Sequence, residues 1–189
     1  MRLSPLTIAI IVLCVASEIA LAIARRSRSP GSDSLDRSSL RALWLVISLA
    51  VTAAILLAGR PWGGFGSRAP AWENTGLAVI LAGLALRWWA ILTLGRAFTV
   101  DVAVASDQRV IEHGPYRLVR HPSYTGILLS FLGLGVVLRH WTSLLALLVP
   151  ITAALLYRIG VEERALRAGL GEAYASYMRR TRRLLPFLC

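Results

Sequence analysis

The densest run of polar residues suited to chemistry lies at positions 113–126, directly before an apolar segment. It contains two histidines, two arginines and two tyrosines, together with two prolines and two glycines that restrict the backbone. Pro122 is well suited to the first turn of a helix, because its ring sets the backbone angle and its missing N–H has no intrahelical partner there. We therefore expect a helix to begin at this proline.

Two functions fit this run. The free amides at the helix start, together with Arg120 and His121, would attract a carboxylate. The same composition also suits a basic anchor at the lipid headgroups, with Tyr116 and Tyr124 in the interfacial belt. The composition alone leaves both open.

A second polar feature consists of Arg158 and Glu162, which are four residues apart and would share one helix face. Such a pair often forms only a surface ion pair. However, just two residues separate the two apolar runs that lie between this feature and the first. A tight hairpin would return the chain to the face where the first run begins. We therefore expect Arg158 and Glu162 to face His121 and Tyr124 across one pocket.

Two charges fall inside apolar runs, Glu18 in the first and Arg87 in the third. An intramembrane charge suggests a functional site by default. Arg87 is close enough to the end of its run to snorkel to the interface or to form a structural pair. For Glu18 we expect pairing or a position facing the helix bundle.

The elements that position these residues are apolar helices. The chain is 56% hydrophobic and 16% charged, against roughly 45–50% and 25% in soluble domains. We predict an all-α, polytopic membrane protein with about five transmembrane helices, a C-terminal helical hairpin and a cytoplasmic helical tail. Spans of about 20 apolar residues are predicted at 6–24, 42–58, 75–94, 124–138 and 141–157.

Several local features refine this outline. The first run is followed by an arginine cluster, which favours a retained helix over a cleaved signal peptide. Pro150 predicts a kink in the fifth run. The tail should form helices at 162–168 and 172–179, with a break at Gly169 and Gly171. Gly133 and Gly135, in mid-helix, indicate close helix packing.

The arginines predict the orientation. Sixteen fall on one side of the predicted spans, namely 25, 26, 28, 37, 41, 96, 109, 117, 120, 158, 164, 167, 179, 180, 182 and 183. Four fall on the other side, at 2, 60, 68 and 139. By the positive-inside rule the C-terminus should face the cytoplasm. The net charge of +11 therefore indicates topology, and we expect no nucleic-acid partner. Cys14 and Cys189 offer no disulfide framework or metal-ligand spacing.

Three motifs, in order, resemble those of the isoprenylcysteine carboxyl methyltransferase family. They are Gly114-Pro115-Tyr116 through Arg120-His121-Pro122-Ser123-Tyr124-x-Gly126, then Arg158-x-x-x-Glu162-Glu163, then Gly171-x-x-Tyr174-x-x-Tyr177 followed by Leu185-Pro186-Phe187. The resemblance runs from about Leu94 to the C-terminus. It implies one membrane domain, 1–189, in which 1–93 supplies transmembrane helices and 94–189 is the cofactor-binding catalytic half.

The resemblance implies S-adenosylmethionine as the cofactor, bound on the cytoplasmic side, and no metal. Arg158 and Glu162 match the catalytic positions, with Arg158 meeting the acceptor carboxylate. The implied cofactor contacts are Asp101, Gln108, Arg109, Val110, Ile111, Tyr116, His121, Pro122, Ser123, Tyr124 and Glu162. The family often has histidine where this chain has Gln108.

The implied partners are membrane lipids and a lipophilic methyl acceptor that enters from the bilayer. The arginine-only basic composition is typical of a GC-rich genome and suggests a bacterial inner membrane. A phospholipid or small-molecule methyltransferase on the same scaffold remains an alternative. So do a sterol-type NADPH reductase, which typically has asparagine where this chain has Ser123, and a non-catalytic membrane module.

Overall fold

The computed structural model describes residues 4–24, 34–66, 70–95 and 110–185. Within these residues the chain is helical, and its only strand-like pairings are isolated bridges, Gly64 with His140 and Val119 with Arg182. The predicted all-α fold is therefore confirmed. The helices are α1 Pro5–Ala24, α2 Ser34–Ala58, α3 Pro70–Leu94, η2 Gly114–Arg117, α4 Pro122–Leu138 and α5 Trp141–Arg180.

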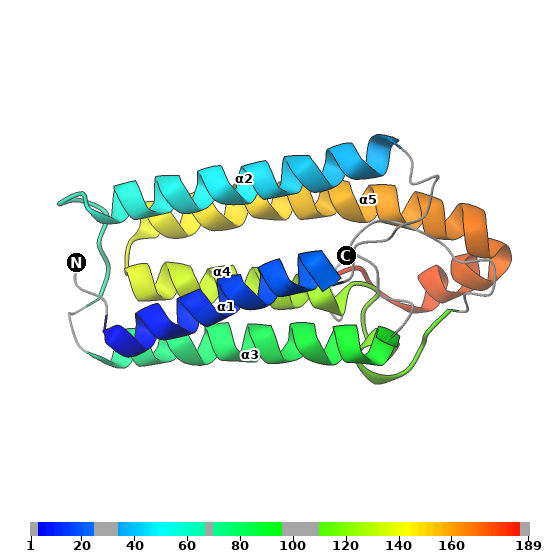
Figure 1. The fold of residues 1–189 in the computed structure, drawn as a ribbon, viewed down its shortest axis with the longest axis horizontal. Coiled ribbons are helices and arrows are strands. Elements are labelled where there is room, and N and C mark those ends of the chain that lie inside the picture. Colours follow the sequence, from blue (N-terminus) through cyan, green and yellow to red (C-terminus); the bar gives the residue numbers. More distant parts are fainter. Residues whose placement is uncertain (1–3, 25–33, 67–69, 96–109, 186–189) are drawn as a thin grey trace.

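The helices form an elongated bundle whose long axes run roughly together (Figure 1). The helix α3 packs along α4, α2 packs along α5, and α4 also contacts α5. The helix α1 contacts α3. A core at the α2, α4 and α5 interfaces is built from Leu43, Ala50, Ala54, Leu138, Leu147, Ile151 and Leu155.

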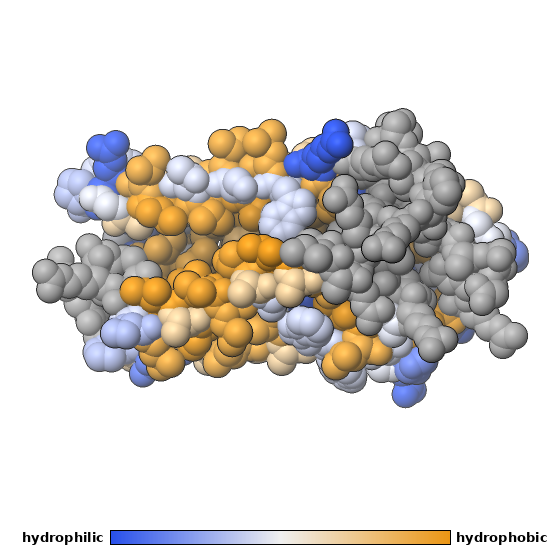
Figure 2. Space-filling model, viewed as in Figure 1, coloured by the Kyte–Doolittle hydropathy of each residue, from blue (hydrophilic) through white to orange (hydrophobic). Residues whose placement is uncertain are grey.

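Five helices occupy the five predicted spans. By length and composition three are able to cross a membrane, at Ser38–Ala58, Pro70–Leu94 and Trp141–Arg180, and two shorter apolar helices lie at Pro5–Leu21 and Pro122–Leu138. Large apolar side chains such as Leu49, Leu92 and Val149 are more than half exposed. Apolar residues cover the middle of the face in Figure 2, with hydrophilic residues towards the ends. This surface is that of a membrane-embedded protein.

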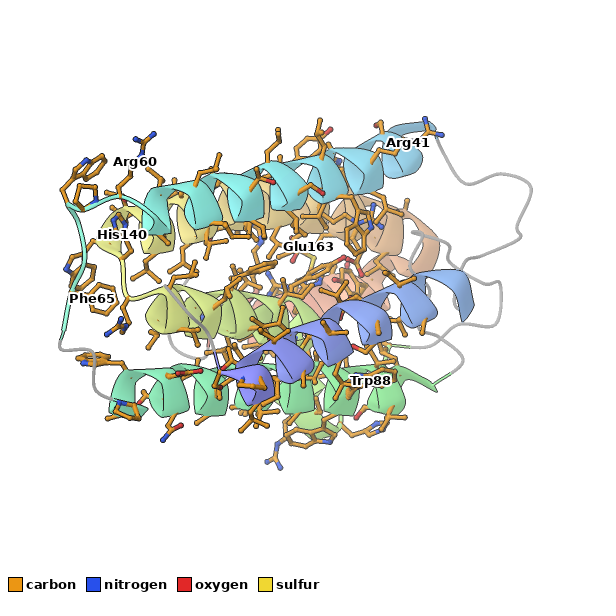
Figure 3. The ribbon with its side chains drawn as sticks, turned by 60° about the vertical axis from the view of Figure 1, so that its left-hand side comes forward. Arg41, Arg60, Phe65, Trp88, His140 and Glu163 are labelled. Atoms are coloured by element: carbon orange, nitrogen blue, oxygen red, sulfur yellow. The ribbon has the colours of Figure 1, made fainter. Side chains whose placement is uncertain are left out.

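The hairpin between α4 and α5 has the predicted two-residue turn. Arg139 ends α4 in the left-handed conformation, with φ 51°, and His140 precedes α5. Its ring lies close to the loop after α2, and Trp141 donates its backbone N–H to the carbonyl of Gly63 at 2.8 Å. Figure 3 shows Arg60, Phe65 and His140 at this end of the bundle, far from Arg41. The turn therefore directs α5 back towards the end where α4 begins.

The tail agrees with the prediction in part. Residues 162–168 are helical as predicted and continue α5, whose regular part runs from Trp141 to Leu170 before the departure at Gly171, or about 45 Å. The predicted break is confirmed at Gly171, with φ 59° and ψ −135°, but is wrong at Gly169, which keeps helical angles. The backbone also stays helical at Pro150. Because the hydrocarbon core is only ~30 Å thick, the second half of α5 extends beyond it.

Candidate active site

The polar run 113–126 is held in place by the C-terminal segment that follows α5. Arg120 donates its backbone N–H to the carbonyl of Arg182 at 2.7 Å, and His121 donates to that of Arg183 at 3.0 Å. The hydroxyl of Thr125 donates to the carbonyl of Leu184 at 2.6 Å. These bonds satisfy backbone groups that would otherwise be orphaned just before a helix. They fix the chain where α4 begins, at the fully buried Pro122.

Glu162 projects from α5 towards the start of α4. Its Oε2 accepts a hydrogen bond from the hydroxyl of Tyr124 at 2.9 Å and lies 3.8 Å from Nδ1 of His121. The rings of His121 and Tyr124 are stacked, with centroids 5.7 Å apart. Arg158 is within hydrogen-bonding reach of the same tyrosine hydroxyl. Glu162 thus faces His121 and Tyr124 across the hairpin, as expected, and Arg158 lies beside Tyr124; the pocket expected between these side chains stays a prediction.

The two motif residues of α5 differ in exposure. The side chain of Glu162 is 28% exposed, so its carboxylate is accessible. Arg158 is 2% exposed, and its Nη1 donates to the hydroxyl of Ser39 on α2 at 2.6 Å. The Arg158–Glu162 ion pair, which is one reading of the spacing, stays a prediction. Ser39 is a neighbour that spacing did not reveal, since it lies 119 residues away.

Glu163 faces a different set of groups and is 4% exposed. Its oxygens accept hydrogen bonds from Nε of Arg120 at 2.8 Å and from Nη2 of Arg183 at 2.8 Å. Nε2 of His121 lies 3.4 Å from the same carboxylate, and it makes no hydrogen bond to the described residues. We expected Arg120 and His121 of the first motif to attract a carboxylate. In the structure this carboxylate is that of Glu163, in the same chain. Figure 3 shows Glu163 among the helices.

Tyr116 lies in η2 and is 6% exposed. Burial, and then the negative charge of Glu162, raise the pKa of its phenol well above the usual range, so the hydroxyl stays neutral. Its carbonyl accepts a hydrogen bond from the hydroxyl of Tyr177 at 2.7 Å. The third motif, in the tail, therefore braces the first. The cofactor contact expected of Tyr116 stays a prediction.

Ser123, in the first turn of α4, is 7% exposed. Its hydroxyl accepts a hydrogen bond from Nη1 of Arg87 at 2.7 Å. Arg87 also forms a two-pronged ion pair with Glu18, in which Nη2 lies 2.6 Å from Oε2. Pairing, which was one of the outcomes expected for each of these intramembrane charges, is confirmed. The cofactor contact expected of Ser123, the further partner of Arg87, stays a prediction.

The remaining predicted contacts lie on the segment that precedes η2. Asp101, Gln108 and Arg109 fall outside the described residues. Val110 and Ile111 are half-buried and lead into η2. Their expected role in binding stays a prediction.

Comparisons with known proteins show which proteins this chain resembles. A model of the isoprenylcysteine carboxyl methyltransferase family matches residues 76–168, a segment that contains α4, Arg158 and Glu162. The chain is 34% identical over 118 residues to protein-S-isoprenylcysteine O-methyltransferase B of Arabidopsis thaliana, covering 61% of this chain and 60% of that protein. It is 34% identical over 115 residues to a probable protein-S-isoprenylcysteine O-methyltransferase of Oryza sativa subsp. indica, with 60% of each covered.

One solved structure has a similar fold. The eukaryotic intramembrane Ras methyltransferase, an isoprenylcysteine carboxyl methyltransferase, superposes with a TM-score of 0.60 and 25% identity. The match covers 96% of this chain and 65% of that one. This chain thus spans about three fifths of the length of the curated relatives that it matches.

Proposed function

Because this chain belongs to the isoprenylcysteine carboxyl methyltransferase family, we propose that it methylates the carboxylate of a lipophilic acceptor at the site around Glu162. The methyl donor in this proposal is S-adenosylmethionine. The observation that carries it is the convergence of Tyr124, Arg158 and Glu162 at one end of the bundle. That convergence lies within the segment that matches the family.

The side chains around Glu162 suit a cofactor that carries a positive charge and a ring. Glu162 offers an accessible carboxylate that can pair with an ammonium or sulfonium charge. The stacked rings of His121 and Tyr124 border it, and aromatic faces attract cations. Glu163, by contrast, is buried between two arginines, so it serves the protein and not the ligand. We assign cofactor contact to Glu162, and the bracing of its surroundings to Glu163.

Arg158 is assigned to orienting the acceptor. A guanidinium can hold a carboxylate through two parallel hydrogen bonds, and its burial strengthens that attraction because the local dielectric is low. In the structure the hydroxyl of Ser39 accepts one of these bonds. We propose that the acceptor carboxylate takes the place of that hydroxyl. Tyr124, which contacts both Arg158 and Glu162, would set the distance between acceptor and donor.

The reaction is then a single displacement. When bound, S-adenosylmethionine supplies an electrophilic methyl group on a positively charged sulfur, which leaves as a neutral thioether. The acceptor oxygen forms the new C–O bond as the S–C bond breaks, and no proton is transferred. The protein's contribution is to align the two reactants and to exclude water. Arg158 must orient the carboxylate without withdrawing all of its charge.

The membrane setting fits a lipophilic acceptor. Apolar side chains are exposed along the bundle, so a lipid tail could lie beside the helices while its carboxylate reaches the site. We propose that the site end faces the cytoplasm, as the arginine distribution favours, in a bacterial inner membrane. The acceptor itself belongs to the proposal, because the chain spans only three fifths of its curated relatives.

The direct test is binding of S-adenosylhomocysteine to the purified chain in detergent. Glu162→Gln should weaken binding about 10- to 150-fold, since a hydrogen bond to a charged group contributes ~1.5–3 kcal/mol. Glu172→Gln is the matched control, because Glu172 lies on the same helix in an exposed pair with Arg179. Glu172→Gln should bind S-adenosylhomocysteine as tightly as wild type does.

Methyl transfer tests the acceptor. Membranes incubated with methyl-labelled S-adenosylmethionine should yield a base-labile methyl ester, and Arg158→Ala should abolish it. A base-stable product would favour a phospholipid or small-molecule amine as the acceptor. A wild-type chain that does not bind S-adenosylhomocysteine would refute the methyltransferase proposal altogether.

A further inference from the structure

An ion pair lies among the apolar helices at a distance from the proposed reacting groups. Glu18 on α1 and Arg87 on α3 form a two-pronged contact, with side chains 26% and 10% exposed. Arg87 is seven residues before the end of α3, roughly 10 Å along the axis. Charges in such surroundings are costly unless they are paired.

Arg87 does more than pair with Glu18. Its third nitrogen, Nη1, donates to the buried hydroxyl of Ser123 at 2.7 Å. Ser123 directly precedes Tyr124, whose hydroxyl meets Glu162. A chain of contacts therefore runs from α1 through α3 to the first turn of α4, and then to the proposed cofactor site.

Close helix packing makes this reach possible. The backbones of α3 and α4 approach so closely that a Cβ on Gly126 would lie 2.9 Å from both Cβ and the backbone nitrogen of Arg87. The Arg87 side chain thus leaves α3 directly beside the first turn of α4. The carboxylate of Glu18 holds the other two nitrogens, so it fixes the direction of the remaining N–H group.

We propose that Glu18 and Arg87 are positioning residues for donor binding, acting through Ser123 on the first turn of α4. This inference rests on the proposed methyltransferase function. In the part of the chain that the structure describes, the hydrogen bonds of Glu18 go to Arg87, and Arg87 in turn reaches Ser123. The effect of Glu18 on affinity would therefore be transmitted rather than direct.

The plain alternative is that the pair only docks α1 onto α3. A second polar clamp between these helices separates the two readings. At the opposite end, Glu73 of α3 accepts hydrogen bonds from the backbone N–H of Ser4, at 3.0 Å, and from the hydroxyl of Thr7. This clamp joins the same two helices but is remote from α4's first turn. If docking is all that matters, loss of either clamp should have the same consequence.

The experiment compares Glu18→Gln with Glu73→Gln in the full chain in detergent. Thermal unfolding and the dissociation constant for S-adenosylhomocysteine are measured for each. Both variants should unfold at a lower temperature than wild type. Only Glu18→Gln should weaken binding, by about tenfold, whereas Glu73→Gln should bind within twofold of wild type.

Glu18→Asp gives a second, conservative variant. It keeps the charge on a shorter side chain, so it should bind the probe within about threefold of wild type. Binding by Glu18→Asp as weak as that of Glu18→Gln would contradict the charge-based relay. The Glu18→Asp variant also keeps the test valid if Glu18→Gln does not fold.

The outcomes separate this inference from the function on which it rests. Normal binding by Glu18→Gln, or equal losses in Glu18→Gln and Glu73→Gln, would overturn the relay while leaving the methyltransferase proposal intact. Failure of the wild-type chain to bind S-adenosylhomocysteine would overturn both.

Discussion

Replacing Gly83 by alanine should force α3 away from α4 at the level of Arg87. A Cβ at position 83 would lie 2.6 Å from the carbonyl oxygen of Gly126 and 2.7 Å from the backbone nitrogen of Ser130. Backbone atoms cannot rotate aside, and ordinary contact begins at 3.4 Å. The helices would therefore have to separate by about 0.8 Å, because interiors are close-packed.

That separation sets the expected loss of stability. Overpacking a tight interface typically costs ~1–3 kcal/mol. For a chain of this size each kcal/mol changes the unfolding midpoint by about 2–4 °C, so Gly83→Ala should lower it by roughly 2–12 °C. The bond from Arg87 to Ser123, now 2.7 Å, would lengthen to about 3.5 Å and cease to be a good hydrogen bond. Binding of S-adenosylhomocysteine should weaken as well.

The matched control is Gly160→Ala in α5. A Cβ there would meet nothing within 4 Å, and alanine is favoured over glycine inside a helix by about 0.5–1 kcal/mol. This variant should unfold at the same temperature as wild type or slightly higher. Unfolding is followed by tryptophan fluorescence in detergent. Equal midpoints for Gly83→Ala and Gly160→Ala would refute the close approach of α3 and α4.

Two further predictions concern the start of α4. Glu163→Gln should lower the free energy of unfolding by about 3–5 kcal/mol, because it leaves Arg120 buried without its charge partner. Glu172→Gln, at the exposed pair on the same helix, should change it by under about 0.5 kcal/mol, and similar losses in both would contradict the burial argument. Thr125→Val removes the hydroxyl bonded to the carbonyl of Leu184. Amide hydrogen exchange at 182–185 should then accelerate about 2- to 12-fold, as ~0.5–1.5 kcal/mol is lost, and unchanged exchange would show that the tail is held otherwise.

Short-range signals in the sequence predicted the elements well. Pro122 marks the start of α4 because proline suits the first turn and only there loses no bond. The two residues between the last apolar runs required a tight antiparallel hairpin, and Arg139 makes it in the left-handed conformation. From that turn followed the meeting of Tyr124 and Glu162. Gly133 in mid-helix indicated close packing, and a Cβ there would lie 2.6 Å from the carbonyl oxygen of Gly76.

The errors arose where local signals were weak. Gly169 was expected to break the helix, yet only Gly171 does, because glycine permits a break without enforcing one. The sequence also did not reveal that the hydroxyl of Ser123 meets Arg87, while the cofactor contact expected of Ser123 stays a prediction. Nothing in the spacing of residues 87 and 123 indicates this hydrogen bond, because the bond depends on how α3 and α4 are rotated about their axes.

The sequence by itself determined which segments are helical and apolar, where the chain turns back, and that two charges inside apolar runs needed either partners or another favourable position. Tertiary structure decided which partners they have. Glu18 meets Arg87 across 69 residues, and Arg120 meets Glu163 across 43. Periodicity identifies the face of a helix, but packing of all the side chains sets the rotation and height at which two helices meet. That rotation brings the first two motifs together and places an intramembrane ion pair beside the first turn of α4.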